Sequence, residues 1–284
     1  MGLRSLAALL VPPVFVSIAR TGRRVIRREP PPWEYAPEGW EHSSGWADDR
    51  DVARVAERYR SKLPAFQAAI EGARPIGVPT SPARGVTPTV ADQNIILEFG
   101  YALGLAGWSR DRVTVLDWGG GVGFLSFVAA ELTPQLAIEY HVKELSGIAA
   151  AGRDLVPGVR FWNDETCLNE RYDLILASNS LQYVEDWRSV LGRFGQSASG
   201  GYVLLQHVPV ARHGSSFTVR QRAYGSAFTS WVFGRDDLLT AASSADLVLV
   251  REFLESLRGS VAGAPSDWES RGFLFRAADR SPGG

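Results

Sequence analysis

A short stretch of the chain, residues 112–123, combines an apolar segment, an acid and closely spaced glycines. Residues 112–116 are rich in β-branched side chains, which is typical of a strand buried in a parallel sheet. Asp117 follows this segment, and three glycines then occupy alternate positions: Gly119, Gly121 and Gly123. Glycine lets a ligand approach the backbone closely, and a helix beginning after the last glycine would direct free N–H groups at that ligand. This order of residues favours binding of a nucleotide-type cofactor.

The glycine spacing distinguishes between cofactor classes. A dinucleotide fingerprint, G-x-G-x-x-G, would need its third glycine at Phe124. The pattern Asp-x-Gly-x-Gly-x-Gly instead resembles the first motif of class I S-adenosylmethionine-dependent methyltransferases. In that family the acid holds the amino group of the cofactor's methionine part, and the glycines line its path. The resemblance therefore implies that Asp117 and the three glycines bind the cofactor.

The second predicted strand, residues 136–144, ends in another acid. Glu144 stands about 20 residues beyond the glycine turn, where the second strand of a nucleotide-binding fold meets a ribose. Glu139 is the rival acid, but it lies in the middle of the strand, where we expect it to face solvent or form a salt bridge. We therefore predict that Glu144 binds the ribose hydroxyls.

Polar residues also follow the third and fourth predicted strands. Residues 159–162 lead into Asn163 and Asp164, and the resembled family contacts the adenine amino group at this position; a turn is the equal alternative, since Asn-Asp favours turns. Residues 172–178 and the segment after them resemble the family's fourth motif. This adds Ser178 and Asn179 to the implied cofactor residues.

Successive strand–helix units predict an α/β fold with a doubly wound parallel sheet and the cofactor at the carboxyl ends of the strands. Further strands are expected at residues 202–207, 245–254 and 271–276, which completes a Rossmann-like, seven-stranded sheet. In the resembled family the seventh strand is antiparallel and lies between the fifth and sixth. We place this methyltransferase domain at residues 92–278, followed by a tail at 279–284.

A Trp-rich and helical extension, residues 30–91, precedes this domain. Its tryptophans either stack on a sugar or cap the hydrophobic core, and the second reading is preferred on general grounds. We expect a helix over residues 51–72, interrupted at Pro64, and a second helix over residues 92–107. Asp92 is the predicted N-cap of the second helix. Gln93 and Asn94 follow in its first turn, either directed at the cofactor pocket or facing solvent.

The first 29 residues form a separate arm in which an apolar run is followed by five arginines. The run is too short for a spanning helix of about 20 residues and contains Pro12 and Pro13. A signal peptide is a weaker alternative, because the arginines oppose export. Two interpretations remain equal: residues 1–28 contact the inner face of a membrane as a peripheral anchor, or the arm packs on the domain.

Composition narrows the class of partner and the compartment. The formal net charge of -1 argues against a nucleic-acid substrate, which needs a basic face. Cys167 is the single cysteine, which excludes an internal disulfide and suits the reducing cytoplasm. The four histidines lack the spacing of metal ligands, so we expect no metal.

Methyl transfer is an in-line displacement, so a site must align the acceptor and supply a base if the acceptor is a hydroxyl. His207, at the end of the fifth predicted strand, is the candidate base; its alternative role is a hydrogen bond in the loop. His213 is a weaker candidate. Tyr183, Gln221 and Arg222 are predicted to contact the acceptor, although the arginines of this segment could equally form a solvated basic face.

The Trp-rich lead-in, the segment 92–94, the glycine motif, the segment 180–186 and Gln221 near Trp231 together resemble methyltransferases encoded among bacterial surface-polysaccharide and lipopolysaccharide genes. The resemblance implies a cytoplasmic enzyme, associated with the membrane if the arm is an anchor, that O-methylates a sugar or glycan precursor with S-adenosylmethionine. Two alternatives stay open: a catalytically silent binding module in a polysaccharide assembly complex, and an O-methyltransferase of small natural products. An NAD-dependent nucleotide-sugar enzyme is disfavoured by the glycine spacing and by the lack of a Tyr-x-x-x-Lys pair.

Overall fold

A computed structural model describes residues 33–40, 49–73, 75–78, 88–223 and 226–279, all within one unit that spans residues 33–284. The N-terminal arm and the expectations attached to it, the membrane anchor and the signal peptide, lie outside the described residues. So does Trp46 of the Trp-rich extension. No helix in the described part of the chain is long and apolar enough to cross a membrane.

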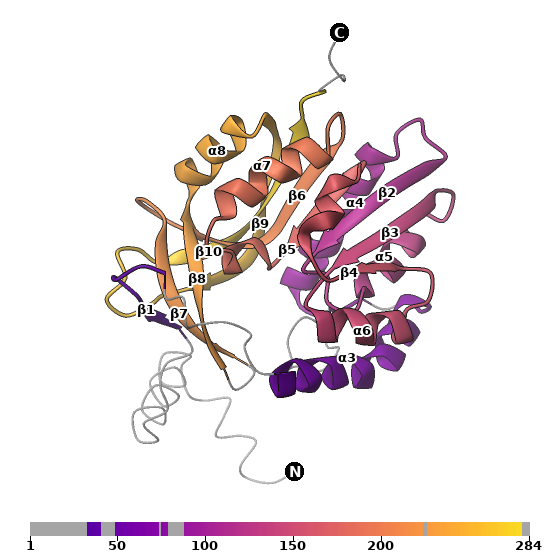
Figure 1. The fold of residues 1–284 in the computed structure, drawn as a ribbon, viewed down its shortest axis with the longest axis horizontal. Coiled ribbons are helices and arrows are strands. Elements are labelled where there is room, and N and C mark those ends of the chain that lie inside the picture. Colours follow the sequence, from indigo (N-terminus) through magenta and orange to yellow (C-terminus); the bar gives the residue numbers. More distant parts are fainter. Residues whose placement is uncertain (1–32, 41–48, 74, 79–87, 224–225, 280–284) are drawn as a thin grey trace, which may run out of the picture. The chain divides into compact units, whose positions relative to one another are not determined.

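The central sheet is mostly parallel, as predicted, and its last strand lies where the resemblance implies (Figure 1). Its strands are β2 (Arg112–Trp118), β3 (Ala137–Lys143), β4 (Arg160–Trp162), β5 (Leu174–Ser178), β6 (Tyr202–Ala211), β9 (Leu247–Gly259) and β10 (Trp268–Ala277). Strands β4, β3, β2, β5 and β6 pair side by side in parallel. Strand β10 is antiparallel and lies between β6 and β9. The prediction for the last strand is therefore confirmed.

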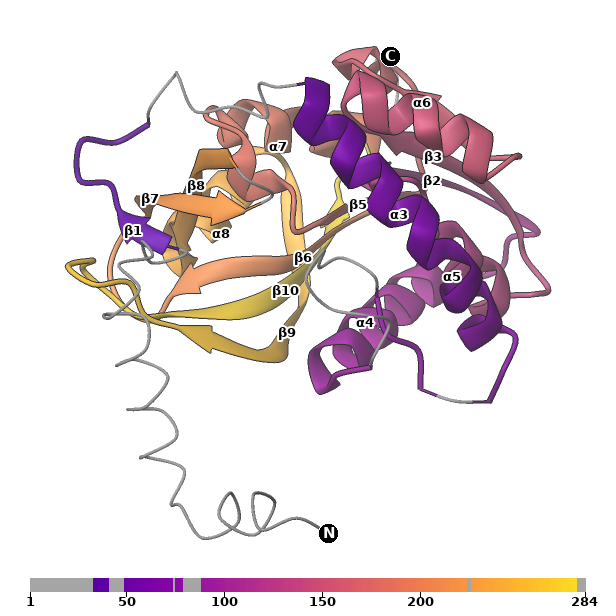
Figure 2. The same cartoon turned by 90° about the horizontal axis from the view of Figure 1, so that it is seen from below.

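Helices cover both faces of this sheet. One face carries α3 (Asp49–Ile70), α4 (Val90–Ala106), α5 (Phe124–Leu132) and α6 (Ser146–Leu155), as Figure 2 shows. The other face carries η1 (Glu165–Asn169), α7 (Trp187–Ser197) and α8 (Arg235–Ser244). Strand residues alternate between these two cores: Val115 packs under α3 to α6, whereas Leu116 packs under α7. Burial on both faces explains the nearly continuous apolar strands in the sequence.

Two helix predictions were wrong in detail. Helix α3 continues through Pro64, because Leu63 and Phe66 on either side are buried in the core and hold the helix together. Helix α4 begins earlier than predicted and has Thr89, not Asp92, as its N-cap. Asp92 is the third helical residue: its carboxylate accepts from the Thr89 backbone N–H at 2.8 Å, and its own N–H donates to Thr89 Oγ1 at 3.1 Å.

The insertion after the fifth strand forms a hairpin that the sequence analysis missed. Strands β7 (Phe217–Ala223) and β8 (Ser226–Gly234) pair in antiparallel fashion, and β1 (Trp33–Tyr35) adds to the outer side of β7. Strand β6 continues to Ala211 and pairs with β8 at its end, so the hairpin extends the main sheet. Trp33 stacks on Trp268 with ring centroids 4.9 Å apart, so this part of the Trp-rich segment packs on the protein itself.

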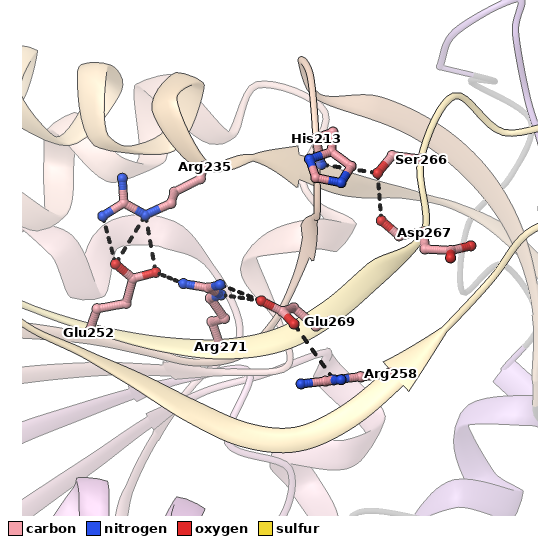
Figure 3. Close-up of polar contacts among 8 residues, drawn as sticks. All are labelled: His213, Arg235, Glu252, Arg258, Ser266, Asp267, Glu269 and Arg271. Atoms are coloured by element: carbon pink, nitrogen blue, oxygen red, sulfur yellow. Dashed lines mark hydrogen bonds and ion pairs between the residues drawn. The ribbon is translucent and has the colours of Figure 1, made fainter.

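An ion-pair network fixes the edge strands to α8 (Figure 3). Arg235 at the start of α8 donates from Nη2 to Glu252 Oε2 of β9 at 2.7 Å. Arg271 of β10 lies between Glu252 and Glu269 and pairs with both. Arg258 Nε is 3.7 Å from the second oxygen of Glu269. The positive and negative side chains of this network alternate and neutralise one another, which indicates a structural role.

Two glycines of α7 test how tightly this face is packed. A Cβ on Gly195 would overlap the carbonyl oxygen of Ala245, which belongs to the backbone and cannot rotate away, whereas a Cβ on Gly192 would meet nothing within 4 Å. We expect Gly195→Ala to lower the free energy of unfolding by roughly 2 kcal/mol or more through overpacking. Gly192→Ala should raise it by up to about 1 kcal/mol, because alanine favours the helix. Urea unfolding of both variants measures the difference; equal stabilities would contradict the close approach.

Candidate functional site

The glycine turn lies where the sequence analysis placed it, between β2 and α5. Gly119, Gly121 and Gly123 have φ angles of 76°, 60° and 85°, in the left-handed region that favours glycine. A pocket opens over this turn at the carboxyl ends of β2 and β5. Its lining residues include Asp117, the glycines 119 to 121, Phe124 and Ser178. The three glycines therefore shape the backbone that borders a cavity.

Asp117 is the buried acid of this pocket. Its exposed fraction is 1%, and one oxygen, Oδ2, accepts a hydrogen bond from the Tyr140 hydroxyl at 2.9 Å. The other oxygen, Oδ1, has no hydrogen-bond partner among the described residues. Burial raises the pKa of Asp117 to about 7, and the nearby Glu144 adds to the rise, while the hydrogen bond from Tyr140 opposes it. A buried carboxylate with a free oxygen suits a cationic donor such as an ammonium group.

Glu144 joins the end of β3 to the glycine turn. Its Oε2 accepts from the Gly121 backbone N–H at 3.1 Å and its Oε1 accepts from the Leu145 N–H at 2.8 Å. Burial raises its pKa, and these two hydrogen bonds act in the opposite direction. Glu139, the rival acid, is exposed, with 3.1 Å to His141 Nε2 and 3.7 Å to Arg112 Nη1. The salt bridge expected of Glu139 is present.

The remaining predicted cofactor residues differ in their surroundings. Asp164 is exposed and caps η1 through a hydrogen bond from the Thr166 N–H at 2.9 Å, so the turn predicted as its alternative role exists. Hydrogen bonds from Thr166 lower the pKa of Asp164. Ser178 lines the pocket. Asn179, the next residue, has a φ of 54° and donates its N–H to the Gln206 carbonyl at 2.8 Å.

The structure brings two residues to the glycine turn that the sequence analysis missed, and one of them, Tyr59, lines the pocket. Tyr59 of α3 lies above the glycine turn: a Cβ on Gly121 would be 3.3 Å from its ring. Ser180 crowds Gly119 from the other side, with its Cβ 2.5 Å from the position of a Gly119 Cβ, and donates to the Trp118 carbonyl at 2.6 Å. The helical spacing of Val55, Tyr59 and Leu63 signals one buried face. It does not say what that face covers.

His207 is not among the residues that line the pocket. It is also not at the end of its strand, which was a wrong prediction because β6 continues to Ala211. Gln206, the residue before it, is the register partner of Ser178. His207 has a φ of 55°, and a register shift in β10 places an extra β6 residue opposite Gly272. This bulge turns His207 out of the regular ladder.

The predicted acceptor residues gather on the hairpin side. The Tyr183 hydroxyl, at the end of η2 (Leu181–Tyr183), donates to Gln221 Oε1 at 3.1 Å, and its ring meets Phe228 edge-on. Arg222 pairs with Glu34 of β1 at 2.9 Å, so its charge is at least partly compensated. Gln93 and Asn94 donate to the carbonyls of Ile76 and Leu254, not to the pocket.

The weaker candidate base, His213, is an exposed residue. His213 lies in an exposed turn beyond β6, where its backbone N–H donates to Ser266 Oγ at 3.1 Å (Figure 3). It is six residues along the chain from His207. No group of three or more His, Cys, Asp or Glu side chains in the described residues is arranged to hold a metal ion.

Comparison with known proteins identifies the class. Residues 94–252, more than half of the chain, match the family described as a methyltransferase domain. The chain belongs to this methyltransferase family, and its cofactor class is that of S-adenosylmethionine-dependent enzymes. No curated protein matches the chain.

Several solved structures are similar to it. The CcbJ methyltransferase from Streptomyces caelestis is 16% identical, with 68% of this chain and 93% of that chain covered and a TM-score of 0.44. The glycopeptide N-methyltransferase MtfA with S-adenosyl-L-homocysteine is 13% identical, covering 65% and 89%, with a TM-score of 0.46. A TehB-like S-adenosylmethionine-dependent methyltransferase from Corynebacterium glutamicum is 16% identical, covering 81% and 100%, with a TM-score of 0.44.

Proposed function

We propose that this protein transfers a methyl group from S-adenosylmethionine to a hydroxyl of a sugar or glycan precursor used for a bacterial surface polysaccharide. One observation supports the proposed cofactor site: buried Asp117, beside the glycine turn, has a carboxylate oxygen without a hydrogen-bond partner among the described residues. The cofactor supplies a methyl group on a sulfonium, which is the electrophile of the reaction. Side chains of the protein itself bind the cofactor and the acceptor and accept the proton.

In this proposal Asp117 binds the ammonium group of the cofactor's methionine part, and the glycine turn admits that part to the backbone. Glu144 binds the ribose hydroxyls after its contact with the Gly121 N–H adjusts. Asp164 borders the adenine end, and Ser178 and Asn179 are further cofactor contacts. Because the hydrogen bond from Tyr140 already orients the Asp117 carboxylate, this side chain reorganises little when the cation binds.

The proposed acceptor site involves the hairpin of β7 and β8 and strand β6. Tyr183 and Gln221 are hydrogen-bonded to each other and present a polar edge beside the ring of Phe228. Trp231, on the same strand β8 as Phe228, stacks on Trp40 with ring centroids 5.9 Å apart. Aromatic faces combined with hydroxyl and amide groups suit a sugar. His207 would accept the proton that the reacting hydroxyl loses.

Calorimetric titration with S-adenosylhomocysteine tests the cofactor site, with NAD as the comparison ligand. We expect micromolar binding of S-adenosylhomocysteine, and a loss of at least about 30-fold in Gly121→Val, because the side chain enters both the pocket and a left-handed φ. Gly263→Val is the matched control: its φ is 78°, and a Cβ there meets nothing within 4 Å. If both variants bind S-adenosylhomocysteine equally weakly, the loss of affinity comes from backbone strain and not from the pocket.

Turnover tests the acceptor. Radiolabelled methyl transfer to a panel of sugars and nucleotide sugars should identify a methylated hydroxyl. Intact cofactor binding without transfer to any acceptor would favour the silent binding module. Transfer to small aromatic hydroxyl compounds but not to sugars would favour a natural-product methyltransferase.

A further inference from the structure

We propose that Glu255 is a positioning residue for the imidazole of His207, and that Glu98, the second buried glutamate beside it, is not. The inference rests on the proposed function in one respect, the use of His207 as a base. Its structural part, the coupling of Glu255 to His207, stands on contacts within the chain.

Glu255 is fully buried on β9, and both of its oxygens accept hydrogen bonds. Oε1 accepts from the His207 backbone N–H at 2.7 Å, and Oε2 accepts from the Ser270 hydroxyl at 2.5 Å. His207 Nδ1 is 3.6 Å from Oε2, which is an ion-pair distance once the imidazole is protonated. Donors from β6 and β10 therefore hold this carboxyl group in place.

Glu98 on α4 approaches the same group from the other side. Its exposed fraction is 3%, and its Oε2 accepts from Gln206 Nε2 at 3.2 Å. Its Oε1 has no hydrogen-bond partner among the described residues, and Glu255 is the acid that neighbours it. A Cβ on Gly272 would overlap Glu98 Oε2, so the glycine leaves room for the carboxyl group. The fold thus makes space for a second acid beside Glu255.

Two adjacent buried carboxyl groups cannot both be ionised without a cation. No lysine or arginine in the described residues forms an ion pair with either glutamate. His207 is the basic side chain beside Glu255, and Asp92 is a further acid that faces the imidazole. Burial and the charge of Glu255 raise the pKa of Glu98 to about 9. Glu98 is therefore the neutral member at pH 7 and can donate its proton to Glu255.

The backbone around this pair is held in unusual conformations. Asn179, His207 and Ser256 have φ angles of 54°, 55° and 58°, although none is glycine. Each such conformation costs on the order of 1 kcal/mol or more and persists where the surroundings impose it. The strain at His207 turns its N–H away from the strand ladder and onto Glu255. Glu255 therefore fixes both the backbone and the Nδ1 side of this histidine.

This arrangement leaves Nε2 as the nitrogen that can receive a proton from an acceptor. On transfer the acceptor would lose its O–H proton to the imidazole. The acceptor oxygen would then bond to the methyl carbon as the bond from that carbon to the sulfonium sulfur breaks, and S-adenosylhomocysteine would be the leaving group. The positive charge then on His207 faces the carboxylate of Glu255. Burial lowers the pKa of His207, and Glu255 and Asp92 oppose that effect, so the imidazole is neutral before the step and stabilised after it.

Titration of the His207 imidazole by NMR tests the coupling without any cofactor or acceptor, with His207→Ala used to assign its signal. We expect Glu255→Gln to lower the imidazole pKa by about one unit, since a carboxylate is lost. The same variant should lower kcat by roughly 30-fold with little change in KM. Glu255→Asp, which keeps the charge, should restore part of the turnover.

Glu98→Gln is the matched control, because glutamine resembles the protonated acid. We expect its His207 titration and kcat to stay within about threefold of the wild type. An unchanged His207 titration in Glu255→Gln, or an equal shift in Glu98→Gln, would overturn the proposal. If Glu255→Gln does not fold, the His207 titration in Glu255→Asp tests the proposal instead. An imidazole pKa equal to the wild-type value together with normal kcat would then contradict the proposal. Full turnover in His207→Ala would show that His207 is not the base of the reaction. It would not contradict the coupling of Glu255 to His207 measured by NMR.

Discussion

Replacing Asp117 with asparagine should weaken binding of S-adenosylhomocysteine on the order of 100-fold and make the ligand-free protein more stable above pH 7. The loss of affinity follows because a buried charged partner of an ammonium group is worth about 2 to 5 kcal/mol when removed. Asparagine keeps the shape of the side chain and can still accept from Tyr140, so the pocket itself should survive.

The gain in stability follows from the direction of the pKa shift. The folded-state pKa of Asp117 is raised from 3.8 to about 7, so the folded protein keeps a proton that the unfolded chain has lost at intermediate pH. Stability contributed by this group is therefore greatest below the unfolded-state value, and it declines as the pH rises towards 7. Asparagine avoids this penalty, whose upper bound is about 4 kcal/mol, and we expect a gain of roughly 1 to 3 kcal/mol at pH 8.

Urea unfolding at pH 5 and pH 8, together with calorimetric titration, measures both effects. The difference between variant and wild type should be large at pH 8 and small at pH 5. Asp154→Asn, at an exposed position of α6, is the control and should change neither quantity. Wild-type affinity should also fall as the pH drops below 7, because the carboxylate becomes protonated. A variant that binds normally, or that is less stable at pH 8, would contradict the assigned role.

Local patterns in the sequence were sufficient for the framework of the fold. Residues 112–116 predicted a buried strand because a strand with helices on both sides is apolar on both faces, and β2 has this environment. Asp117 was found because it stands next to a glycine turn in the chain. In each case the residues that cooperate are close in sequence, so their spacing carries the information.

The residues that were missed act across long distances in the chain. Tyr59 reaches the glycine turn from α3, and Glu98 meets Glu255 from α4, more than 150 residues away. Neither partnership has a spacing that could be recognised. The hairpin of β7 and β8 was missed for a related reason: its polar strand residues indicated a binding insertion, whereas pairing with β1 and β6 decides their structure. The N-cap was misplaced because Asp92 takes part in the capping box from within the helix.

Replacing His207 with alanine should lower kcat by about 100-fold to 10,000-fold while S-adenosylhomocysteine still binds with unchanged affinity, because general-base catalysis contributes on this scale. The imidazole lies beside Glu255, and His207 is not among the residues that line the glycine pocket, so the two readouts are separable. His213→Ala is the matched control: this exposed histidine should be replaceable without effect on kcat.

The left-handed backbone at His207 demands a second variant before a loss of turnover can be assigned to the imidazole. Alanine at a φ of 55° is strained, and the strain alone could displace Ser178 and Asn179, whose strand pairs with Gln206. Asparagine adopts this conformation more readily than other residues but cannot take up a proton at pH 7. If the imidazole is the base, His207→Asn and His207→Ala should lose kcat equally in a methyl-transfer assay. Normal turnover in His207→Asn would show that the conformation at this position, and not its proton chemistry, is what the reaction requires.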